Sequence, residues 1–317
     1  YHPDLELWIW DNHDAIPLPE TSIDEMIDEM KSQLVERNAD HYSMSFSFTR
    51  GYLEIHSDLL KMNFRGDVTD FNKKVNKLSA GKPLTIYVGY DSRHKDIAEL
   101  SAKCLKSSIL FGAGHGDIHD ILGDWTPEIK FLDISKIPEY NREYAAQSTE
   151  FTYSRFLIPY LENYEGFSIF IDDDILFNES ILPMFYYLDL DDAVACVQYD
   201  FDTYAETKFN GEKNVSYPKK LWSSLMIFNN GHEDCKKLTP EVINTESGKY
   251  LHQFEWTDKI SEIPEWYVIT EGHDTQEEKW RACAIHYTRG GPWIEGMDTS
   301  EIEHLNMYER FKNKHQN

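Results

Sequence analysis

The sequence is short of cysteine, and its cysteines are not arranged in pairs. Four cysteines are scattered over 317 residues, and none of them forms a C-x-x-C pair. This scarcity argues against a zinc site built from cysteines and against a disulfide framework. A chain of this kind is typical of a reducing compartment, so we expect a cytoplasmic protein.

The sequence also lacks a long hydrophobic run. No apolar stretch reaches the about 20 residues that a membrane-spanning helix requires, and the first residues do not have the pattern of a signal peptide. There is no internal repeat or low-complexity segment. With 41% hydrophobic residues, the chain has enough apolar material for one large domain or two smaller ones. We therefore expect a globular protein with no transmembrane segment.

Basic residues are in the minority. The 31 lysines and arginines face 56 aspartates and glutamates, which gives a formal net charge of −25. A chain with this charge repels polyanions, so its composition disfavours a nucleic-acid partner. A small anionic substrate stays compatible with the composition if a metal ion or a local arginine neutralises it.

The pattern of residues divides the chain near residues 78–83. Within residues 1–80, Ser22 and Glu25 form a capping box at the start of an amphipathic helix. Apolar and polar residues then alternate from Tyr42 to Phe48, as in a half-buried strand. We predict that residues 1–80 are an α+β accessory region of unknown role and that residues 81–317 form the main domain.

From Leu84 onward, apolar runs of strand length alternate with helical patterns. Helices are expected over residues 94–110 and 150–164. The expected strands are "LTIYVGY", "EIKFLDI", "FSIFID", "AVACVQY" and "SLMIFN". This order predicts the α/β class, with a parallel or mixed sheet that carries helices on both faces. Sheets of this class bind ligands beyond the carboxyl ends of their strands.

Three consecutive aspartates follow one of these strands, in "FSIFIDDDILF" at residues 167–177. Buried carboxylates are costly unless they are paired or bound to a metal. Asp172 and Asp174, spaced by one residue, can face one hard cation while Asp173 turns toward another ligand. The structural alternative is a solvated acidic turn at the end of a strand.

Several stretches resemble glycosyltransferase family 8, which includes glycogenin and lipopolysaccharide galactosyltransferases. "TYSRFLIPYLENYEGFSIFIDDDILF" is similar to that family's Thr-Tyr-x-Arg-Leu and Tyr-Leu-Asp-x-Asp segment, "WSSLMIFNN" to an internal strand, and "HYTRGGPW" to its closing motif. The resemblance covers residues 84–294 and leaves the first 80 unexplained. It implies a GT-A fold, which is Rossmann-like, and transfer of a sugar from a nucleotide diphosphate sugar, most often a UDP-sugar, to an acceptor hydroxyl with retention of configuration.

The resemblance also implies a metal site and its ligands. Asp172 and Asp174 match the D-x-D ligands and His286 matches the third protein ligand. Two carboxylates with one imidazole suit Mn²⁺, with Mg²⁺ as the alternative. A lone histidine is more often structural, but His286 directly precedes the closing motif "YTRGGPW".

Further residues are implied on the donor side. Arg155 would lie near the nucleotide sugar, where it could clamp a phosphate or Asp173, although a helix-surface salt bridge is the structural alternative. Trp222 and Ser223 could line a sugar pocket, and Trp222 could equally belong to the core. Contacts with the base and the ribose are expected from Gly89, Tyr90, Asp91 and Arg93. Asp91 could also serve as a helix cap.

The closing motif departs from the family in one position. Where the family has a lysine that contacts the diphosphate, this chain has Gly291, and the motif is one residue shorter. Arg289 is the substitute cation that we expect, and Gly290 would let backbone amides approach a phosphate. On the acceptor side, Glu255 and Asp258 are the candidate catalytic residues, and a solvated acidic helix end is the alternative for both.

Two other functions stay open at this point. A phosphatase of the haloacid dehalogenase type also has a strand that ends in Asp-x-Asp, with the first aspartate as nucleophile. That class continues with Gly-Thr, whereas this chain continues with Ile175 and Leu176. A nucleotide-sugar binding module without turnover is the second alternative, and only the missing lysine supports it. The overall acidity leaves a glycan, a lipid-linked sugar or a protein as the acceptor.

Overall fold

The computed structural model describes residues 83–111, 127–143, 147–178, 181–199, 218–272 and 282–315, and five strands between residues 8 and 67. These five strands form an antiparallel sheet in the order β2-β1-β5-β4-β3. The alternating segment that predicted a strand is β3, whereas the helix expected from Ser22 lies outside the described residues. The strands are β1 (Trp8–Asp11), β2 (Asp14–Pro17), β3 (Met44–Thr49), β4 (Tyr52–Ser57) and β5 (Met62–Asp67).

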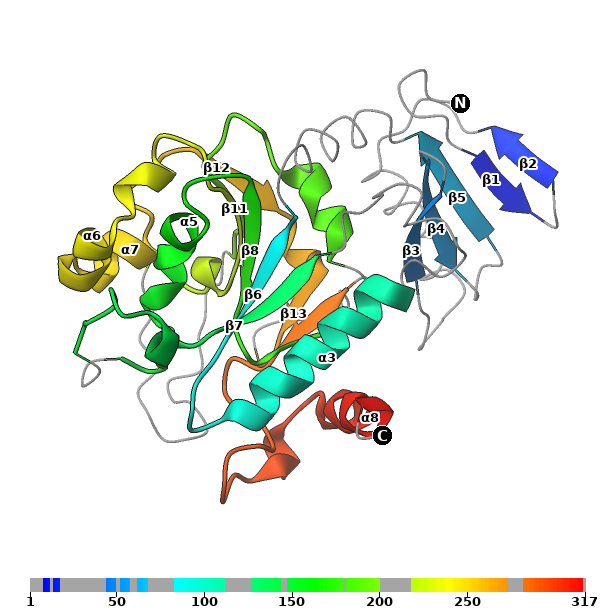
Figure 1. Ribbon diagram of the computed structural model, residues 1–317. Coiled ribbons are helices and arrows are strands. Elements are labelled where there is room, and N and C mark those ends of the chain that lie inside the picture. Colours follow the sequence, from blue (N-terminus) through cyan, green and yellow to red (C-terminus); the bar gives the residue numbers. More distant parts are fainter. Residues whose placement is uncertain are drawn as a thin grey trace.

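The main sheet has six strands in the order β12-β10-β11-β8-β6-β7 (Figure 1). Only β11 runs against the other five, because it pairs antiparallel with both β8 and β10. The strands are β6 (Thr85–Gly89), β7 (Glu128–Leu132), β8 (Phe167–Ile171), β10 (Val194–Val197), β11 (Leu225–Asn229) and β12 (Ile260–Ile263). The first five coincide with the five strands expected from the sequence, and the mixed, mostly parallel sheet confirms the predicted fold class.

Successive residues of each strand point to opposite faces of the sheet, and both faces are covered. On one face, Ile169 and Ile171 of β8 pack in a buried cluster with Leu105 of helix α3 (Lys95–Phe111). On the other face, Phe170 packs with Leu251 of helix α7 (Gly248–His252). Figure 1 shows α3 on one side of the sheet, and α5 (Ile158–Leu161), α6 (Pro240–Thr245) and α7 on the other.

The continuous helix expected over residues 150–164 is wrong. The chain forms a 3-10 helix, η3 (Ser154–Leu157), and then the single-turn helix α5. Pro159 has no backbone N–H to donate to the carbonyl of Arg155, so an α-helical ladder cannot run through this point. The shorter geometry leaves all four residues of η3 buried, including Arg155.

After the aspartates, the chain enters a second, three-stranded sheet, in which the strand order is β13-β14-β9. Strand β8 ends at Ile171, Asp172 to Asp174 make a turn, and β9 (Ile175–Phe177) begins at once in the small sheet. Strands β13 (Val268–Thr270) and β14 (Ala284–His286) complete it. The three aspartates therefore connect the main sheet to the small sheet along the chain. Among the described residues, no helix has the length and apolar character needed to cross a bilayer.

Candidate active site

Strand pairing brings His286 to the aspartates across more than a hundred residues of sequence. His286 is the last residue of β14, and its partner in the antiparallel pair with β9 is Ile175, the residue directly after Asp174. The Tyr287 N–H then donates to the Asp174 carbonyl at 3.2 Å and extends this pairing by one step. The register of the small sheet therefore places the imidazole beside the acidic turn.

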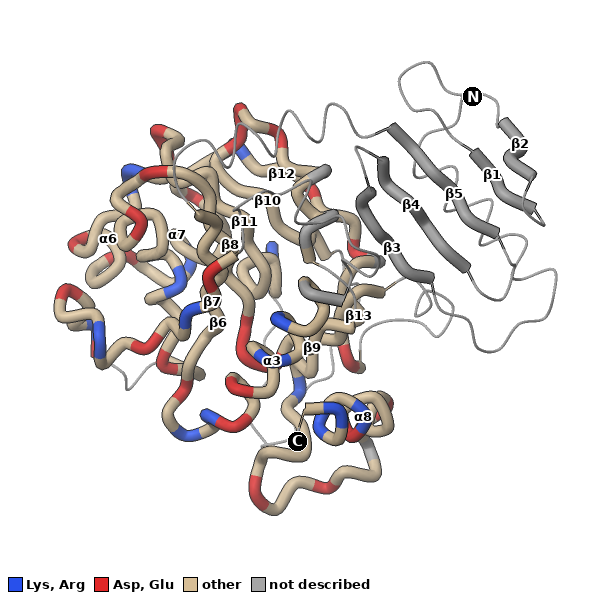
Figure 2. Tube along the Cα trace, turned by 45° about the vertical axis from the view of Figure 1, so that its right-hand side comes forward, with Lys and Arg blue, Asp and Glu red and all other residues tan. Residues whose placement is uncertain are grey.

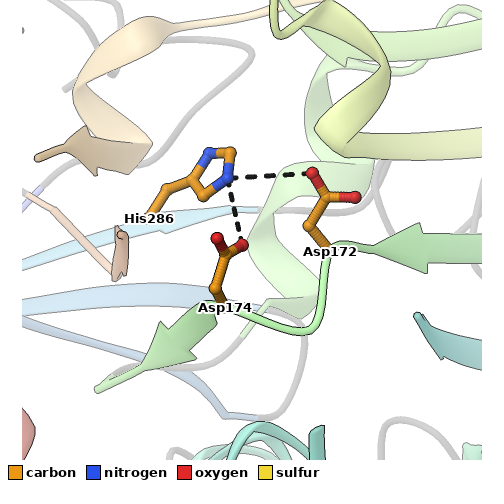
Figure 3. Close-up of side chains that lie close together, drawn as sticks. All are labelled: Asp172, Asp174 and His286. Carbon is orange, nitrogen blue, oxygen red and sulfur yellow. Dashed lines mark ion pairs between the residues drawn. The ribbon is translucent and has the colours of Figure 1, made fainter. Parts of the chain in front are cut away.

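The three predicted ligands converge (Figure 3). His286 Nε2 lies 3.2 Å from Asp174 Oδ1 and 3.7 Å from Asp172 Oδ2. One ligand atom from each of the three residues lies within 4.8 Å of the others. His286 is buried, whereas Asp172 and Asp174 keep partial access to solvent. Burial by itself lowers the pKa of His286, but the charges of Asp174 and Asp172 and the hydrogen bond to Asp174 outweigh it and raise the pKa.

Arg155 forms an ion pair with Asp172, the first of these aspartates. Its Nη1 lies 2.7 Å from Asp172 Oδ1 and donates to the Ser223 carbonyl at 2.8 Å. The guanidinium carbon lies 4.7 Å from the centre of the Phe170 ring, and the whole side chain is buried. The alternative of a helix-surface salt bridge is therefore wrong for Arg155, and its carboxylate partner is Asp172 rather than Asp173.

Asp173 is buried and is not one of the three residues whose ligand atoms converge. Burial raises the pKa of its carboxyl well above the usual range, and the negative charges of Asp174, Asp172 and Asp91 act in the same direction. Arg155 opposes this rise only in part. The middle residue of the D-D-D turn therefore differs from the two outer ones in its burial, and its turn toward another ligand stays a prediction.

The last residue of β6 and the turn after it hold four of the predicted donor contacts. Asp91 is fully buried and accepts from the Arg93 backbone N–H, from the Arg93 guanidinium, and from the Glu150 N–H. Packing favours a glycine at position 89, because a Cβ there would come within 2.8 Å of the Phe151 ring. Tyr90 is half-buried, with its ring 5.5 Å from that of Phe131. Asp91 therefore organises this turn, and any contact with a nucleotide would be additional.

In the closing motif, Gly291 packs closely against the ring of Trp293. A Cβ on Gly291 would lie 2.1 Å from the Trp293 ring, so no side chain fits there without moving the tryptophan. Trp293 packs edge-on against Tyr287 and also contacts Tyr308 of the C-terminal helix α8 (Leu305–His315). This packing leaves no room for a side chain at position 291, where the resemblance would place a lysine. Arg289 and Gly290 are partly exposed, and Gly290 has a φ of +99°.

Ser223 and His252 form a polar contact beside Arg155 that the sequence did not reveal. Ser223 Oγ lies 2.8 Å from His252 Nδ1, and the imidazole also packs edge-on against Phe156 at 5.2 Å. Burial, together with the positive charges of Arg155 and Arg142, lowers the pKa of His252 to about 3. A single histidine in a short helix carries no sequence signal for such a role. Trp222 is half-buried and packs against the core clusters of both sheet faces, so its structural alternative holds in part.

The two acceptor-side candidates lie apart from this cluster. Glu255 is exposed and pairs with Lys249 at 2.6 Å. Asp258 is also exposed and lies just before β12, where that strand begins. Because β12 runs parallel to β10 and β8, its start lies at the sheet edge opposite to the one that carries the aspartates. Both positions argue against a direct part in catalysis, and the assignment stays a prediction.

The donor set fits a divalent cation. Two carboxylates and one imidazole offer ligand atoms to a single point, where His286 Nε2 faces both Asp172 and Asp174. Asp172, Asp173 and Asp174 bring three carboxyl groups together near the guanidinium of Arg155. A cation at this point would offset the repulsion among them.

Comparison with known sequences agrees with this geometry. Residues 125–256 match the model of the family described as "Glycosyl transferase family 8". That range contains Asp172, Asp174 and Arg155 and ends before His286. "Protein CDI" from Arabidopsis thaliana is 37% identical over 236 residues, which cover 73% of this chain and 87% of that protein.

Solved structures of glycosyltransferases are similar at low identity. The apo structure of the WbbM bifunctional glycosyltransferase has a TM-score of 0.46 at 11% identity, and GlyE from Streptococcus pneumoniae TIGR4 has 0.44 at 13%. Each match covers 73% of this chain, which spans 50% and 60% of those two chains. The galactosyltransferase LgtC has 0.42 at 12% identity, with 73% and 95% covered. On the strength of the family model and the Arabidopsis relative, the chain belongs to glycosyltransferase family 8.

Proposed function

We propose that this protein transfers a sugar from a nucleotide diphosphate sugar, with UDP as the nucleotide, to an acceptor hydroxyl in a metal-dependent and retaining reaction. One observation carries the proposal: Asp172, Asp174 and His286 offer their ligand atoms to one point at the carboxyl end of β8. In parallel sheets, this edge is where ligands bind.

Each residue of the cluster has its own proposed role. Asp172, Asp174 and His286 would hold Mn²⁺ or Mg²⁺, which when bound neutralises the charge of a diphosphate leaving group. Arg155 orients Asp172 through its 2.7 Å ion pair, so the carboxylate need not reorganise when the cation arrives. Gly89, at the end of β6, and Gly290, in the closing motif, would lie on either side of the donor.

The donor would be held by residues from three segments. Tyr90 and Arg93 would contact the base and the ribose, and Asp91 would keep their turn in shape. Arg289 would approach the diphosphate in place of the missing lysine. Trp222 and Ser223 would line the sugar, with the hydroxyl facing its polar edge and the indole its apolar face.

Other parts of the proposal rest on chemistry and on the family. Retention of configuration comes from the family resemblance, and Glu255 and Asp258 are the acceptor-side candidates that remain to be tested. The acceptor would be a glycan, a lipid-linked sugar or a protein, because the net charge of −25 disfavours nucleic acid. All four cysteines are free thiols, which suits a cytoplasmic setting. We infer that residues 1–80 act as an accessory region beside the domain of residues 81–317.

The test is a calorimetric titration of nucleoside diphosphates into the protein, with Mn²⁺ and with a chelator. We expect UDP to bind with Mn²⁺ and at least about ten-fold more weakly without it. Asp174→Asn should abolish the effect of Mn²⁺ because it removes one ligand charge from the cluster. Asp191→Asn is the matched control, since Asp191 is exposed in a different turn.

Equal UDP binding in the Asp174→Asn variant would overturn the metal assignment. The family match does not favour the phosphatase. In such a phosphatase Asp172 would be the nucleophile, and its ion pair with Arg155 does not suit a carboxylate that must be free to attack. Tight UDP binding with no slow hydrolysis of any UDP-sugar in Mn²⁺ would revive the binding module. The anomeric configuration of the product, read by NMR, decides between retention and inversion.

A further inference from the structure

The ring of His252, the last residue of helix α7, is held by two aromatic neighbours. It lies edge-on to the Phe156 ring at 5.2 Å and is tilted against the Tyr153 ring at 5.6 Å, measured between ring centres. The Arg142 guanidinium in turn lies 3.7 Å from the centre of the Tyr153 ring. Because Tyr153 and Phe156 flank Arg155 in the chain, the imidazole is packed against the segment that carries Arg155.

The hydrogen bond between Ser223 and His252 runs from the hydroxyl to the ring. Figure 2 shows acidic residues on many of the described segments, but the charges that act on His252 are positive. Burial, and then the charges of Arg155 and Arg142, lower its pKa to about 3, so the ring is neutral. The hydroxyl of the buried Ser223 lies 2.8 Å from Nδ1, and its proton needs an acceptor. Among the described residues Nδ1 is the acceptor within reach, which places the ring hydrogen on Nε2.

The backbone of Ser223 and Ser224 is bonded to the metal-binding turn at two points. The Ser223 carbonyl accepts from Arg155 Nη1 at 2.8 Å, and the same Nη1 lies 2.7 Å from Asp172 Oδ1. The Ser224 carbonyl accepts from the Asp172 N–H at 2.8 Å. The position of these two carbonyls therefore sets the position of both Arg155 and Asp172.

This segment needs contacts from outside to keep its geometry. Leu221, two residues before Ser223, has a φ of +65°, in the left-handed region that is unfavourable for a residue with a side chain. Such a conformation persists where surrounding contacts impose it. Two side-chain bonds to other elements do so here: the Trp222 indole N–H donates to the Tyr199 carbonyl at 3.0 Å, and Ser223 bonds to His252.

We propose that His252 is a positioning residue of the metal site. By accepting the Ser223 proton, it fixes the Ser223 carbonyl, which orients Arg155, and Arg155 in turn orients Asp172 toward the cation. Residues that orient metal ligands in this way typically contribute about 10- to 100-fold to metal affinity. This inference rests on the proposed function and deepens it by naming a residue that supports the cation without touching it.

The experiment is a calorimetric titration of Mn²⁺ into the wild type, His252→Leu and His252→Asn, with urea unfolding in parallel. We expect His252→Leu to weaken Mn²⁺ binding about ten-fold. His252→Asn should keep most of the affinity, because the amide oxygen can accept the Ser223 proton. Ser223→Ala removes the same bond from the other side and should cause a similar loss. The double variant Ser223→Ala/His252→Leu should bind no more weakly than the single variants, because both remove one interaction.

A second readout needs no metal. The Arg155 Nε–H donates to the Phe151 carbonyl at 3.3 Å, and NMR measures the exchange of this hydrogen with solvent. We expect faster exchange in His252→Leu and in Ser223→Ala, and nearly wild-type exchange in His252→Asn. Nitrogen NMR of the wild type should place the ring hydrogen of His252 on Nε2.

His232→Leu is the matched control. His232 is also half-buried, and its Nδ1 also accepts a hydrogen bond, from the Asp234 N–H at 3.1 Å. It follows the end of β11, which pairs with the start of β8 and so lies at the sheet edge opposite to the aspartates. This variant should leave both the Mn²⁺ affinity and the exchange of Arg155 unchanged.

The inference is overturned if His252→Leu and Ser223→Ala bind Mn²⁺ as the wild type does, or if His252→Asn loses as much affinity as His252→Leu. Additive losses in the double variant, or a ring hydrogen on Nδ1, also overturn it. If the wild type itself does not bind Mn²⁺, the proposed function fails. The exchange of Arg155 then still decides the positioning role of His252: faster exchange in His252→Leu supports it, and unchanged exchange rejects it.

Discussion

Arg155 and Asp172 form a buried ion pair in which Nη1 and Oδ1 are 2.7 Å apart. The same guanidinium lies against the rings of Phe151 and Phe170, at 5.3 and 4.7 Å, and donates to the Phe151 and Ser223 carbonyls. Arg155 therefore ties the metal-binding turn to η3 on one side and to the start of β11 on the other. Such a pair positions a ligand more than it stabilises the fold, because burying both charges is itself costly.

We expect Arg155→Lys to weaken Mn²⁺ binding about 10- to 100-fold, because a lysine cannot hold Asp172 and the Ser223 carbonyl in one planar fork. The measurement is calorimetric titration of Mn²⁺, with urea unfolding in parallel. Arg142→Lys is the matched control, since Arg142 also stacks on a ring, at 3.7 Å from that of Tyr153, but bonds to the Ile243 and Glu246 carbonyls. An equal loss of Mn²⁺ affinity in both variants would contradict a positioning role for Arg155.

Restoring the family's lysine should damage the protein rather than improve it. Gly291→Lys forces Trp293 out of its contacts with Tyr287 and Tyr308, so we expect a loss of about 1–3 kcal/mol in the free energy of unfolding and no gain in UDP affinity. Gly231→Ala is the control, because its Cβ would meet only one carbonyl oxygen at an ordinary 3.5 Å. A Gly291→Lys protein of normal stability that binds UDP more tightly would refute this explanation of the missing lysine.

The histidine beside Ser223 should make stability depend on pH. The pKa of His252 is about 3 in the folded protein, below its ordinary value of 6.5, so the unfolded chain binds this proton more readily. The contribution is therefore fully favourable above pH 6.5 and is lost as the pH falls toward 3. Because the ring keeps some solvent access, we expect a decrease of about 1–2 kcal/mol in the free energy of unfolding between pH 7 and pH 5.

Urea unfolding at several pH values measures this dependence in the wild type and in His252→Gln, which cannot titrate. The variant should be less sensitive to pH over this range. Carbon NMR of the histidine ring provides a second readout, since the imidazole should stay neutral at pH 5. Parallel stability curves for the two proteins would show that His252 does not carry the effect.

The exposed acidic candidates should tolerate neutralisation. Because Glu255 pairs with Lys249 at the surface and Asp258 lies at the far edge of the sheet, we expect Glu255→Gln and Asp258→Asn to change turnover by less than about three-fold, or about 0.7 kcal/mol. Initial rates of UDP-sugar hydrolysis or transfer provide the measurement, with Asp174→Asn as the inactive reference. A hundred-fold decrease in kcat for either variant would restore that residue as catalytic.

Local pattern was sufficient for five of the six strands of the main sheet and for the ligands that lie close together in the chain, but it did not predict β9, β12, β13 or β14. The strands β6, β7, β8, β10 and β11 follow from apolar runs of strand length, because the burial of such a run depends mainly on its own residues. Asp172 and Asp174 follow from their position after β8 and their spacing, and His286 followed only from its place in a motif that resembles a family. The helix over residues 150–164 was wrong because Pro159 shortens it, a signal that was present in the sequence but outweighed by the apolar periodicity.

Only the tertiary structure decided which distant residues meet. The register of β9 with β14 places His286 beside Asp174, and no local property of either strand specifies that register. The buried environment of Arg155 and the contact of His252 with Ser223 likewise depend on several elements at once. Sequence determines what a segment prefers, whereas packing between segments determines the distances, the burial and the charges on which the chemistry of a site depends.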